Sequence, residues 1–404
     1  MLNGKWKFLP LLLGYLAIVL IFAKVQPVYD ELRYLMFADN LIHGYYSPRP
    51  NINLWNGPGY PLVLTPFVLF QIPLIYAKLL NAFFLFGFVL FFYQTLRLYL
   101  AERPSFCFAY LIGLYPPLWG LVPALYTESF ILLLIGGFIF FYCKGYRRSG
   151  KYAVFLSGFF LAYLALTKVF FGFVLMIGLG ISLALWFWKR TNPWKKTAVV
   201  YSVAFFLCLP YLTYTYLLTG RILYWSNSGG LSLYCMSTPF AGESGDWFDD
   251  KKFGNNPLLA KNHQDFFTQI SKLPAVDKDE ALKKKAIQNI IEHPSKFALN
   301  WLANVGRLLF NYPYSYTTQK LSTYAFMLPN MFLIVFFALL VYPAIKAYRT
   351  IPYELFSLLG FVLIAFGGSS LLSAYSRQFL PLTPIVCLWI FFIWSKIVRI
   401  EVRR

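Results

Sequence analysis

The sequence has few charged residues and few cysteines. Only 13% of its 404 residues are charged, whereas roughly 25% are charged in ordinary soluble domains. Of the residues present, 59% are hydrophobic and 21% aromatic, and the mean hydropathy is +0.57. This composition excludes an ordinary soluble domain and predicts an all-α integral membrane protein. All five cysteines except Cys235 lie in predicted spans, so no disulfide framework or CxxC metal pattern is expected.

Apolar runs of membrane-spanning length recur along the chain. A helix needs roughly 20 apolar residues to cross a bilayer, and we predict about ten such spans. They cover residues 8–23, 74–96, 105–122, 126–143, 152–167, 169–188, 197–218, 323–345, 353–372 and 378–395. The first run has no small-residue cleavage site after it and is expected to be a retained anchor. Prolines 61, 66 and 73 interrupt residues 59–73, which favours an interfacial or re-entrant segment.

Basic residues alternate between the connections of these spans. With a cytoplasmic N-terminus, most Lys and Arg residues near span ends fall on the inner side, as the positive-inside rule requires. Both termini are then cytoplasmic. The net charge of +20 comes largely from these residues, so it indicates contact with anionic membrane lipids and no nucleic-acid partner. Most acidic residues face outward, which places any chemistry on the outer face.

Two longer outer segments separate the chain into three parts. Residues 1–219 form an N-terminal transmembrane module whose first outer loop, residues 24–73, begins an amphipathic helix at Asp30 and Glu31. Residues 220–320 are expected to form a small, mainly helical extracytoplasmic region, and residues 321–404 the C-terminal transmembrane helices. Repeats of fixed period and matching broken helices are not recognisable, which weakens an inverted-repeat transporter interpretation.

Isolated charges at the outer ends of spans are the candidate functional residues. Asp30 and Glu31 taken alone are equally well explained as a helix N-terminus, where acids are favoured. Glu128, Lys168 and Arg377 occupy similar outer positions in other parts of the chain. Uncompensated charge near lipid is costly and usually functional. The cations suit a phosphate and the carboxylates suit a general base, so together they indicate sugar transfer from a lipid phosphate.

The same residues carry a resemblance to a known superfamily. The segments DELRY (30–34), NGPGYPL (56–62), LTK (166–168) and SRQFLPLTP (376–384) resemble, in this order, the GT-C membrane glycosyltransferases. The similar branch contains the protein O-mannosyltransferases and the lipid A aminoarabinose transferases. The resemblance implies a GT-C-like fold, a polyprenyl-phosphate-linked sugar donor, and an active site at the outer surface.

Site residues follow from this resemblance by position. Asp30 matches the family's base, with Glu31 beside it, and Glu128 matches an acidic position after the third span. The expected donor-phosphate contacts are Arg33, Tyr34, Lys168 and Arg377. Aminoarabinose transferases carry Glu-Lys where this chain has Asn56 and Gly57, which removes a carboxylate linked to metal binding and a phosphate-binding lysine.

The remaining candidates are aromatic and amide side chains. Trp55, Asn56, Tyr60 and Trp247 are expected as sugar or acceptor contacts, although aromatic residues near membranes are mostly packing or belt residues. The three histidines have no partner at metal-ligand spacing. No cofactor or metal is therefore expected to be required, and the residues give no support for a divalent metal.

The leading hypothesis is an inverting glycosyltransferase that moves a sugar from a polyprenyl phosphate to a hydroxyl of a glycan, lipid or protein. A lipid-linked oligosaccharide flippase or transporter is an alternative, but it predicts charges on both faces. An O-antigen ligase or polymerase is another, but it would rely on Arg and His in the large outer loop. The absence of N-x-S/T sequons favours a bacterial inner membrane with the site facing the periplasm. The sequence does not define the sugar, the acceptor or the oligomeric state.

Overall fold

The computed structural model describes residues 5–28, 30–148, 150–316, 319 and 321–398, and these residues form helices and no strands. The helices in the first half are α1 (Leu9–Phe22), α2 (Asp30–Ile42), α3 (Gly59–Leu69), α4 (Leu74–Leu96), α5 (Glu102–Gly113), α6 (Glu128–Arg147), α7 (Lys151–Thr167), α8 (Phe170–Lys189) and α9 (Asn192–Thr219). The second half contains α10 (Gly229–Met236), α11 (Pro257–Ile270), α12 (Ala275–Glu292), α13 (Pro294–Phe310), α14 (Tyr324–Lys346), α15 (Tyr353–Ser370) and α16 (Thr383–Lys396).

Short 3-10 helices connect several of these elements. They are η1 (Lys5–Phe8), η2 (Arg49–Asn51), η3 (Pro116–Leu118), η4 (Asp250–Asn255), η5 (Leu321–Thr323), η6 (Tyr348–Thr350), η7 (Ser376–Gln378) and η8 (Leu380–Leu382). The all-helical fold class predicted from composition is confirmed for the described residues.

Seven segments of the described chain are long and apolar enough to cross a membrane. They are α4, α6, α8, α9, α14, α15 and the segment Ser376–Lys396 that contains α16. The predicted spans at residues 8–23 and 152–167 are helical and apolar but shorter, covering Trp6–Phe22 and Lys151–Thr167. These segments make the chain an integral membrane protein, although the predicted number of ten spans is not confirmed.

The segment at residues 105–122 is the clearest difference between the ten predicted spans and the seven spanning segments of the structure. Its helix, α5, ends at Gly113, and Pro116 and Pro117 follow in η3. A proline has no backbone N–H and disfavours the helical conformation of the residue before it, so the helix cannot continue through this pair. The predicted interfacial segment at residues 59–73 forms α3, whose 11 residues are too few to cross a bilayer.

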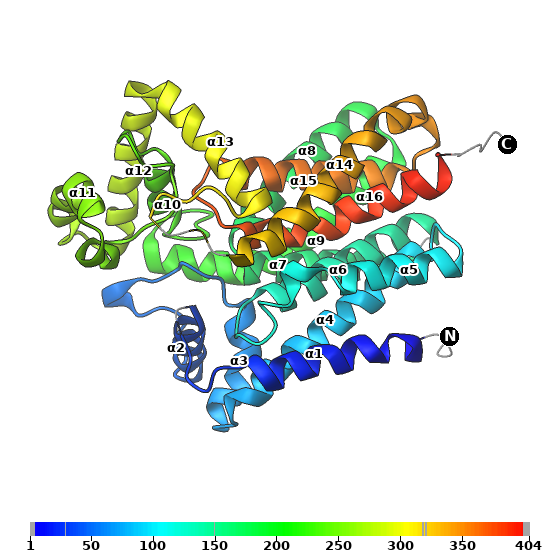
Figure 1. The fold of residues 1–404 in the computed structure, drawn as a ribbon, viewed down its shortest axis with the longest axis horizontal. Coiled ribbons are helices and arrows are strands. Elements are labelled where there is room, and N and C mark those ends of the chain that lie inside the picture. The colour runs from blue at the N-terminus through cyan, green and yellow to red at the C-terminus, as the bar shows by residue number, and fades with distance from the viewer. Residues whose placement is uncertain (1–4, 29, 149, 317–318, 320, 399–404) are drawn as a thin grey trace.

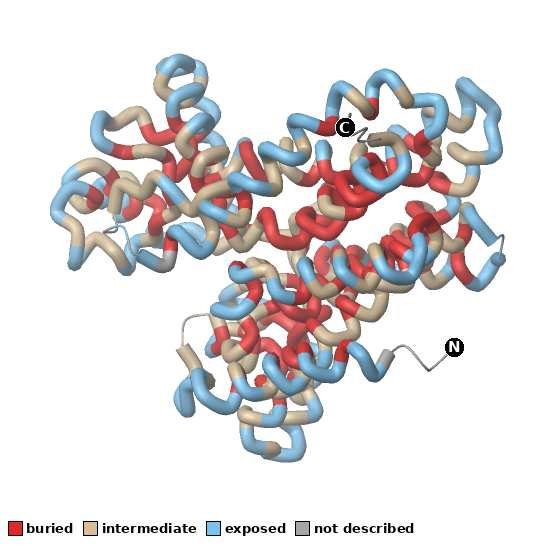
Figure 2. Tube along the Cα trace, turned by 45° about the vertical axis from the view of Figure 1, so that its right-hand side comes forward, coloured by how far each residue is buried: buried red, intermediate tan, exposed pale blue. Residues whose placement is uncertain are grey.

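The apolar helices pack side by side into one bundle. Helix α6 packs against α4 and α7, while α9 packs against α7 and α8. Figure 2 shows the buried residues concentrated along the middle of this bundle. Helix α1 begins and α16 ends at the same end of the bundle, and α11 and α12 lie at the opposite end (Figure 1). This arrangement agrees with termini on one side of the membrane and the region around α10 to α13 on the other.

Helix α2 runs across the direction of the bundle at the end nearer α11 and α12 (Figure 1). Two acidic residues, Asp30 and Glu31, occupy its first turn, where the helix dipole favours negative charge. Its side chains Leu32 and Met36 are exposed, as expected for an amphipathic helix at a membrane surface. Helices α10 to α12 enclose a second, smaller apolar core around Phe248 and Phe267.

Candidate active site

A cavity of about 700 Å³ lies where the start of α2 meets α6, the end of α7 and η7. These elements are far apart in the sequence. Nine of the eleven predicted site residues line the cavity: Asp30, Arg33, Tyr34, Trp55, Asn56, Glu128, Lys168, Trp247 and Arg377. The sequence motifs therefore converge on one place in the fold.

Five charged side chains form an alternating row along the polar wall of this cavity. Arg33 donates to Asp30, and Arg377 Nη2 donates to Asp30 Oδ2 at 2.7 Å. Arg377 Nε lies 3.8 Å from Glu128 Oε1, and Lys168 Nζ lies 3.6 Å from the same oxygen. Each carboxylate is thus held between two cations. With three cations and two carboxylates, the row carries a net charge of +1.

Aromatic rings fix the central cation of the row. The Arg377 guanidinium lies 5.4 Å from the ring centre of Tyr126 and 5.7 Å from that of Tyr375. Aromatic faces attract cations, and a guanidinium held between rings and carboxylates loses little further freedom when it binds a ligand. Tyr126 and Tyr375 were not predicted as site residues. Their sequence signal is their place two residues before Glu128 and Arg377.

The ion pairs also set the protonation of Asp30. Burial by itself would raise the pKa of this carboxyl, but the adjacent Arg377 and Arg33 guanidinium groups outweigh it and lower the pKa below its ordinary value. Asp30 is therefore a carboxylate at neutral pH. Among the described residues, no group of three or more His, Cys, Asp or Glu side chains is arranged to hold a metal ion.

The NGPG segment at residues 56–59 explains how the first outer loop reaches this site. A Cβ at Gly57 would lie 1.9 Å from the Leu166 carbonyl oxygen, and one at Gly59 would lie 2.4 Å from Thr167 Oγ1. Both glycines are needed because the loop packs directly on the end of α7, next to Lys168. The structure thus gives a physical reason for the departure noted at Asn56 and Gly57: position 57 has no room for a lysine side chain.

Two predicted site residues lie outside the cavity, which corrects their expected places. Tyr60 is buried, packs edge-on against Tyr34 with ring centres 5.3 Å apart, and donates to Asn81 Oδ1 at 3.5 Å. Its ring is therefore part of the packing under the cavity and is not available to stack on a sugar. Glu31 is 1% exposed and points away from the cavity because adjacent residues on a helix face directions about 100° apart.

Aromatic and basic side chains form the outer wall of the cavity. Trp55 and Trp247 pack edge to face with ring centres 6.3 Å apart, although they come from different outer segments. Arg33 lies 5.1 Å above the Trp55 ring, and Lys252 lies 5.3 Å above the Trp247 ring. Lys252 was not predicted, since a lysine in the sequence DDKK carries no distinguishing signal. Its position over Trp247 makes it a fourth cation at the cavity.

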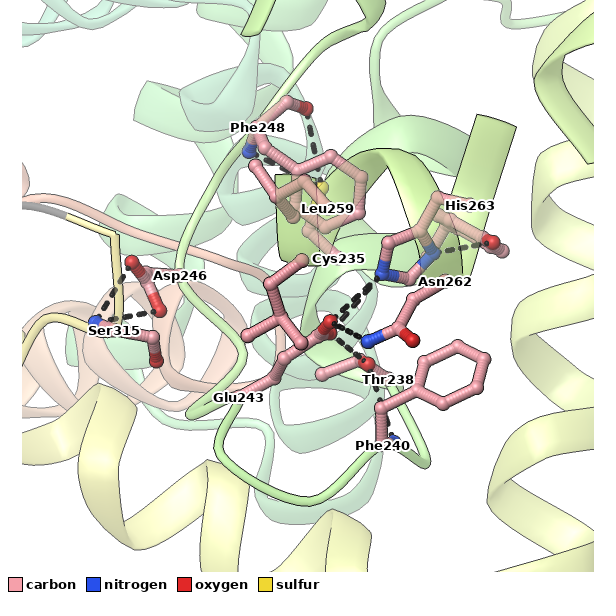
Figure 3. A network of polar contacts seen from close by, with 12 residues as sticks. Cys235, Thr238, Phe240, Glu243, Asp246, Phe248, Leu259, Asn262, His263 and Ser315 are labelled. Atoms are coloured by element: carbon pink, nitrogen blue, oxygen red, sulfur yellow. Dashed lines mark hydrogen bonds and ion pairs between the residues drawn. The ribbon is translucent and has the colours of Figure 1, made fainter. Parts of the chain in front are cut away.

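A buried polar network anchors the loop that carries Trp247 (Figure 3). Glu243 accepts from Asn262 Nδ2 at 2.7 Å, contacts His263 Nε2 at 3.0 Å, and accepts a hydrogen bond from Thr238. Burial would raise the pKa of Glu243, but these hydrogen bonds outweigh it and lower the pKa. The buried Glu243 carboxylate thus ties the loop between α10 and η4 to Asn262 and His263 of α11.

Helix α13 holds this loop and the segment before Arg377 together. Asn304 Nδ2 donates to the Leu372 carbonyl at 2.7 Å, and Asn304 Oδ1 accepts from the Ala374 N–H at 3.1 Å. Arg307, from the next turn of the helix, donates to the Ser244 carbonyl at 2.8 Å. These residues were missed, but the sequence does contain a signal: polar Asn304 and Arg307 share one helix face, three residues apart.

One side of the cavity is apolar. Its walls include Leu121, Phe170, Phe173, Phe326 and Leu372. Phe173 is 50% exposed on α8, and Ile177 and Ile181, which follow it along this helix, are similarly exposed. A side chain of this kind is stable at a lipid-facing surface. The cavity therefore joins a row of charges to a surface that suits hydrocarbon.

Comparison with known proteins gives matches at the level of structure. No protein-family model and no curated protein matches the chain. An oligosaccharyltransferase of Archaeoglobus fulgidus, solved with a tethered acceptor peptide containing an NVT sequon, is similar with a TM-score of 0.50 and 13% identity, over 96% of this chain and 49% of that one. The oligosaccharyltransferase AglB of the same organism, in complex with an inhibitory peptide and a dolichol-phosphate, is similar with a TM-score of 0.48 and 13% identity. The match covers 96% of this chain and 50% of that one.

A third solved structure is ArnT from Cupriavidus metallidurans bound to undecaprenyl phosphate. It gives a TM-score of 0.41 and 11% identity, over 97% of this chain and 78% of that one. The present chain spans about half the length of the two archaeal structures. The oligosaccharyltransferase of the first comparison is a GT-C glycosyltransferase, the superfamily whose motifs the sequence resembles. Since the likeness to the archaeal oligosaccharyltransferase extends over nearly the whole chain, this protein has the fold of the GT-C membrane glycosyltransferases.

Proposed function

We propose that the chain is an inverting glycosyltransferase that uses a polyprenyl-phosphate-linked sugar and a hydroxyl acceptor on a glycan, lipid or protein. The observation that carries this proposal is the row of Arg33, Asp30, Arg377, Glu128 and Lys168, with its net charge of +1. A polyprenyl-phosphate sugar is a phosphodiester with one negative charge. The row therefore supplies both the balancing charge for the donor and a carboxylate for the acceptor.

The chemistry assigns a proton and an electron pair to specific groups. Asp30 takes the proton of the acceptor hydroxyl while the oxygen attacks the anomeric carbon from the face opposite the phosphate. The bond from that carbon to the phosphate oxygen breaks, and its electron pair stays on the departing polyprenyl phosphate. Arg377, Arg33 and Lys168 stabilise the second negative charge that develops there, an effect worth about 3 kcal/mol for a well-placed donor.

The apolar wall supports a lipid-linked donor. Leu121, Phe170 and Phe173 line the cavity together with Lys168. Phe170 and Phe173 belong to α8, whose exposed face begins at Phe173. A polyprenyl chain placed there would bury apolar surface without leaving the membrane. The phosphate would then lie at the row of charges, with the sugar directed toward Trp55 and Trp247.

The orientation of the helices supports an active site on the outer face. Basic residues occupy the last turns of α6, α8, α14 and α16, including Lys144, Lys189, Lys346 and Lys396. Such residues favour the cytoplasmic side. Glu128 begins α6 and thus lies at its other end. We place the protein in a bacterial inner membrane with the cavity facing the periplasm.

The function can be tested with purified protein in lipid vesicles. The donors are undecaprenyl phosphates that carry radiolabelled glucose, mannose or aminoarabinose, and the acceptor is a bacterial membrane extract. We expect label transfer only in vesicles whose residues 220–316 face the compartment that holds the acceptor, as measured by protease access to this region. We also expect transfer in the presence of a chelator, because basic side chains supply the positive charge at the phosphate.

Two outcomes would contradict the proposal. Transfer restricted to the opposite vesicle orientation would show that the site faces the cytoplasm. Movement of intact donor across the bilayer without formation of a labelled product would show that the protein is a transporter. A heat-denatured sample and an Asp30→Asn sample serve as controls for non-enzymatic label release.

The outer wall of the cavity is the proposed contact for sugar rings. Trp247 and Trp55 offer flat apolar faces, and Asn56 Oδ1 is buried without a hydrogen-bond partner among the described atoms. An unpaired buried acceptor is costly, so a ligand hydroxyl at this place would be stabilised by donating to it. We propose that Trp55, Asn56 and Trp247 bind a sugar of the donor or of the acceptor.

Substitution of Trp247 distinguishes a sugar of the donor from a sugar of the acceptor at this wall. Trp247→Ala should raise the KM of the substrate whose sugar it contacts by about tenfold, which corresponds to about 1.4 kcal/mol, and should leave the other substrate's KM unchanged. The measurement is steady-state kinetics with each substrate varied in turn. Trp188→Ala, at an exposed position on the other end of α8, is the matched control. Unchanged KM values for both substrates in Trp247→Ala would remove this contact from the site.

A further inference from the structure

Glu31, next to the proposed base, makes contacts that the proposed reaction does not use. Its carboxylate bridges two separate backbone segments: Oε2 accepts from the Val28 N–H at 2.8 Å, and Oε1 accepts from the Leu125 N–H at 2.7 Å. The first segment leads directly into Asp30, and the second leads into Glu128. One buried side chain therefore connects the two parts of the chain that carry the carboxylates of the cavity.

Helix α4 provides the support for this bridge. Lys78 is 1% exposed, and its Nζ lies 3.3 Å from Glu31 Oε1 and 2.7 Å from the Lys24 carbonyl oxygen. Three residues later, Asn81 donates to the Val122 carbonyl at 3.1 Å and to the Ala124 carbonyl at 2.6 Å. Both side chains thus hold the connections before α2 and before α6 against the same face of α4.

A buried ion pair is a weak source of stability, because removing both charges from water costs about as much as their attraction returns. Its value here is geometric, since a carboxylate with two oxygens can accept from two backbone N–H groups and an amide can accept with only one oxygen. The contacts of Glu31 fix the Leu125 backbone relative to the start of α2. Glu128 begins α6 three residues later, and Asp30 directly precedes Glu31.

From these contacts we infer that Glu31 is a positioning residue, held by Lys78, that sets the place of Asp30 relative to Glu128 and the Arg377 cation between them. The inference rests on the proposed glycosyltransferase function. Glu31 touches neither donor nor acceptor in this arrangement. Its loss should therefore lower kcat while leaving the KM of the donor close to its normal value.

The experiment compares Glu31→Gln, Lys78→Met and the double variant in the vesicle transfer assay. In Glu31→Gln, one backbone N–H loses its acceptor, so kcat should fall at least tenfold with a donor KM within twofold of the wild type. Lys78→Met keeps both N–H contacts, so its kcat should fall less than threefold. The double variant should regain the thermal midpoint lost by Lys78→Met, because no charge is left unpaired, but its kcat should stay at the level of Glu31→Gln.

A matched control separates positioning from general stability. Glu354 is also a buried carboxylate, which accepts from Tyr99 at 2.8 Å and pairs with Arg147 Nε at 2.9 Å, but it lies near the other end of α6. Glu354→Gln should lower the thermal midpoint and leave kcat within twofold of the wild type. Hydrogen exchange in residues 122–128 should increase in Glu31→Gln and not in Glu354→Gln.

The outcomes distinguish this inference from the proposed function. A normal kcat in Glu31→Gln, or recovery of kcat in the double variant together with its stability, would overturn the positioning role and leave the glycosyltransferase intact. Equal loss of kcat in Glu31→Gln and Glu354→Gln would show that kcat follows stability alone and would also overturn it. If the wild-type protein transfers no sugar from any lipid phosphate, the proposed function fails and the inference fails with it.

Discussion

Replacement of Asp30 by asparagine is expected to lower kcat by about 10² to 10⁴, the usual contribution of a general base. The amide keeps the size of the side chain and an oxygen that can accept from Arg377, but it cannot take the proton of the acceptor hydroxyl. Binding of the donor should be retained because Arg33, Lys168 and Arg377 remain in place. The measurement is transfer at saturating donor, together with equilibrium binding of undecaprenyl phosphate.

Asp39→Asn is the matched control for this variant. Asp39 lies on the same helix, α2, but its side chain is exposed and its neighbour is His43. The substitution removes one acidic charge from α2 without affecting the cavity, so kcat should stay within twofold of the wild type. If Asp30→Asn transfers sugar at the normal rate, Asp30 is only an ion-pair partner at the start of a helix, and Glu128 becomes the candidate base.

The pH dependence gives an independent test of the same residue. Because the ion pairs lower the pKa of Asp30, the free enzyme should keep its base ionised down to pH values below about 3.9, the ordinary pKa of an aspartate. The same shift contributes folding stability above that value, which is lost as the pH falls through the lowered pKa. kcat/KM should therefore show no loss from Asp30 protonation between about pH 5 and 8.

A bound donor changes this balance. Its phosphate competes with Asp30 for the Arg33 and Arg377 guanidinium groups, so the pKa of Asp30 should rise when the donor is bound. The acid limb of kcat reports the bound state and should lie at higher pH than the acid limb of kcat/KM. Identical acid limbs would indicate that the donor phosphate does not share these two cations.

Hydropathy and helical spacing were sufficient to predict most of the membrane-spanning helices and the amphipathic α2. Apolar runs directly report segments that must satisfy their backbone hydrogen bonds inside lipid. The predicted span at residues 105–122 is not confirmed, because a hydropathy average does not show that Pro116 and Pro117 end a helix. The resemblance to the GT-C enzymes grouped Asp30, Glu128, Lys168 and Arg377 by role. Their spacing along the chain does not indicate how far apart they lie in space. The structure places all four at one cavity.

The direction of neighbouring side chains was harder to predict than their position in the sequence. Glu31 carries the same charge as Asp30 and lies beside it in the sequence. Its environment is nevertheless set by Lys78 and by the Leu125 N–H from another connection. Likewise, Lys252 is recognised as a residue of the cavity only from its position over the Trp247 ring. Such contacts depend on the tertiary path of loops, and a single sequence contains no periodic signal for that path.

Arg377 is the residue whose loss should affect both binding and catalysis. Its guanidinium contacts Asp30 through Nη2 and Glu128 through Nε and is enclosed by the Tyr126 and Tyr375 rings. Arg377→Ala removes the cation between the two carboxylates, so donor binding should weaken and kcat should fall by about 10² to 10³. Arg377→Lys should recover little of this loss, because an ammonium cannot contact both carboxylates as a planar fork does.

Binding of undecaprenyl phosphate and transfer kinetics measure the two effects of Arg377 separately. Arg349→Ala, an exposed arginine of η6, should leave both unchanged and controls for the loss of a basic residue. The double variant Asp30→Asn/Arg377→Ala should lose less activity than the sum of the single effects on ΔG‡, because both substitutions break the same ion pair. Full activity of Arg377→Lys would show that only charge is needed at this position. Simple additivity in the double variant would show that Arg377 acts on the donor phosphate without help from Asp30.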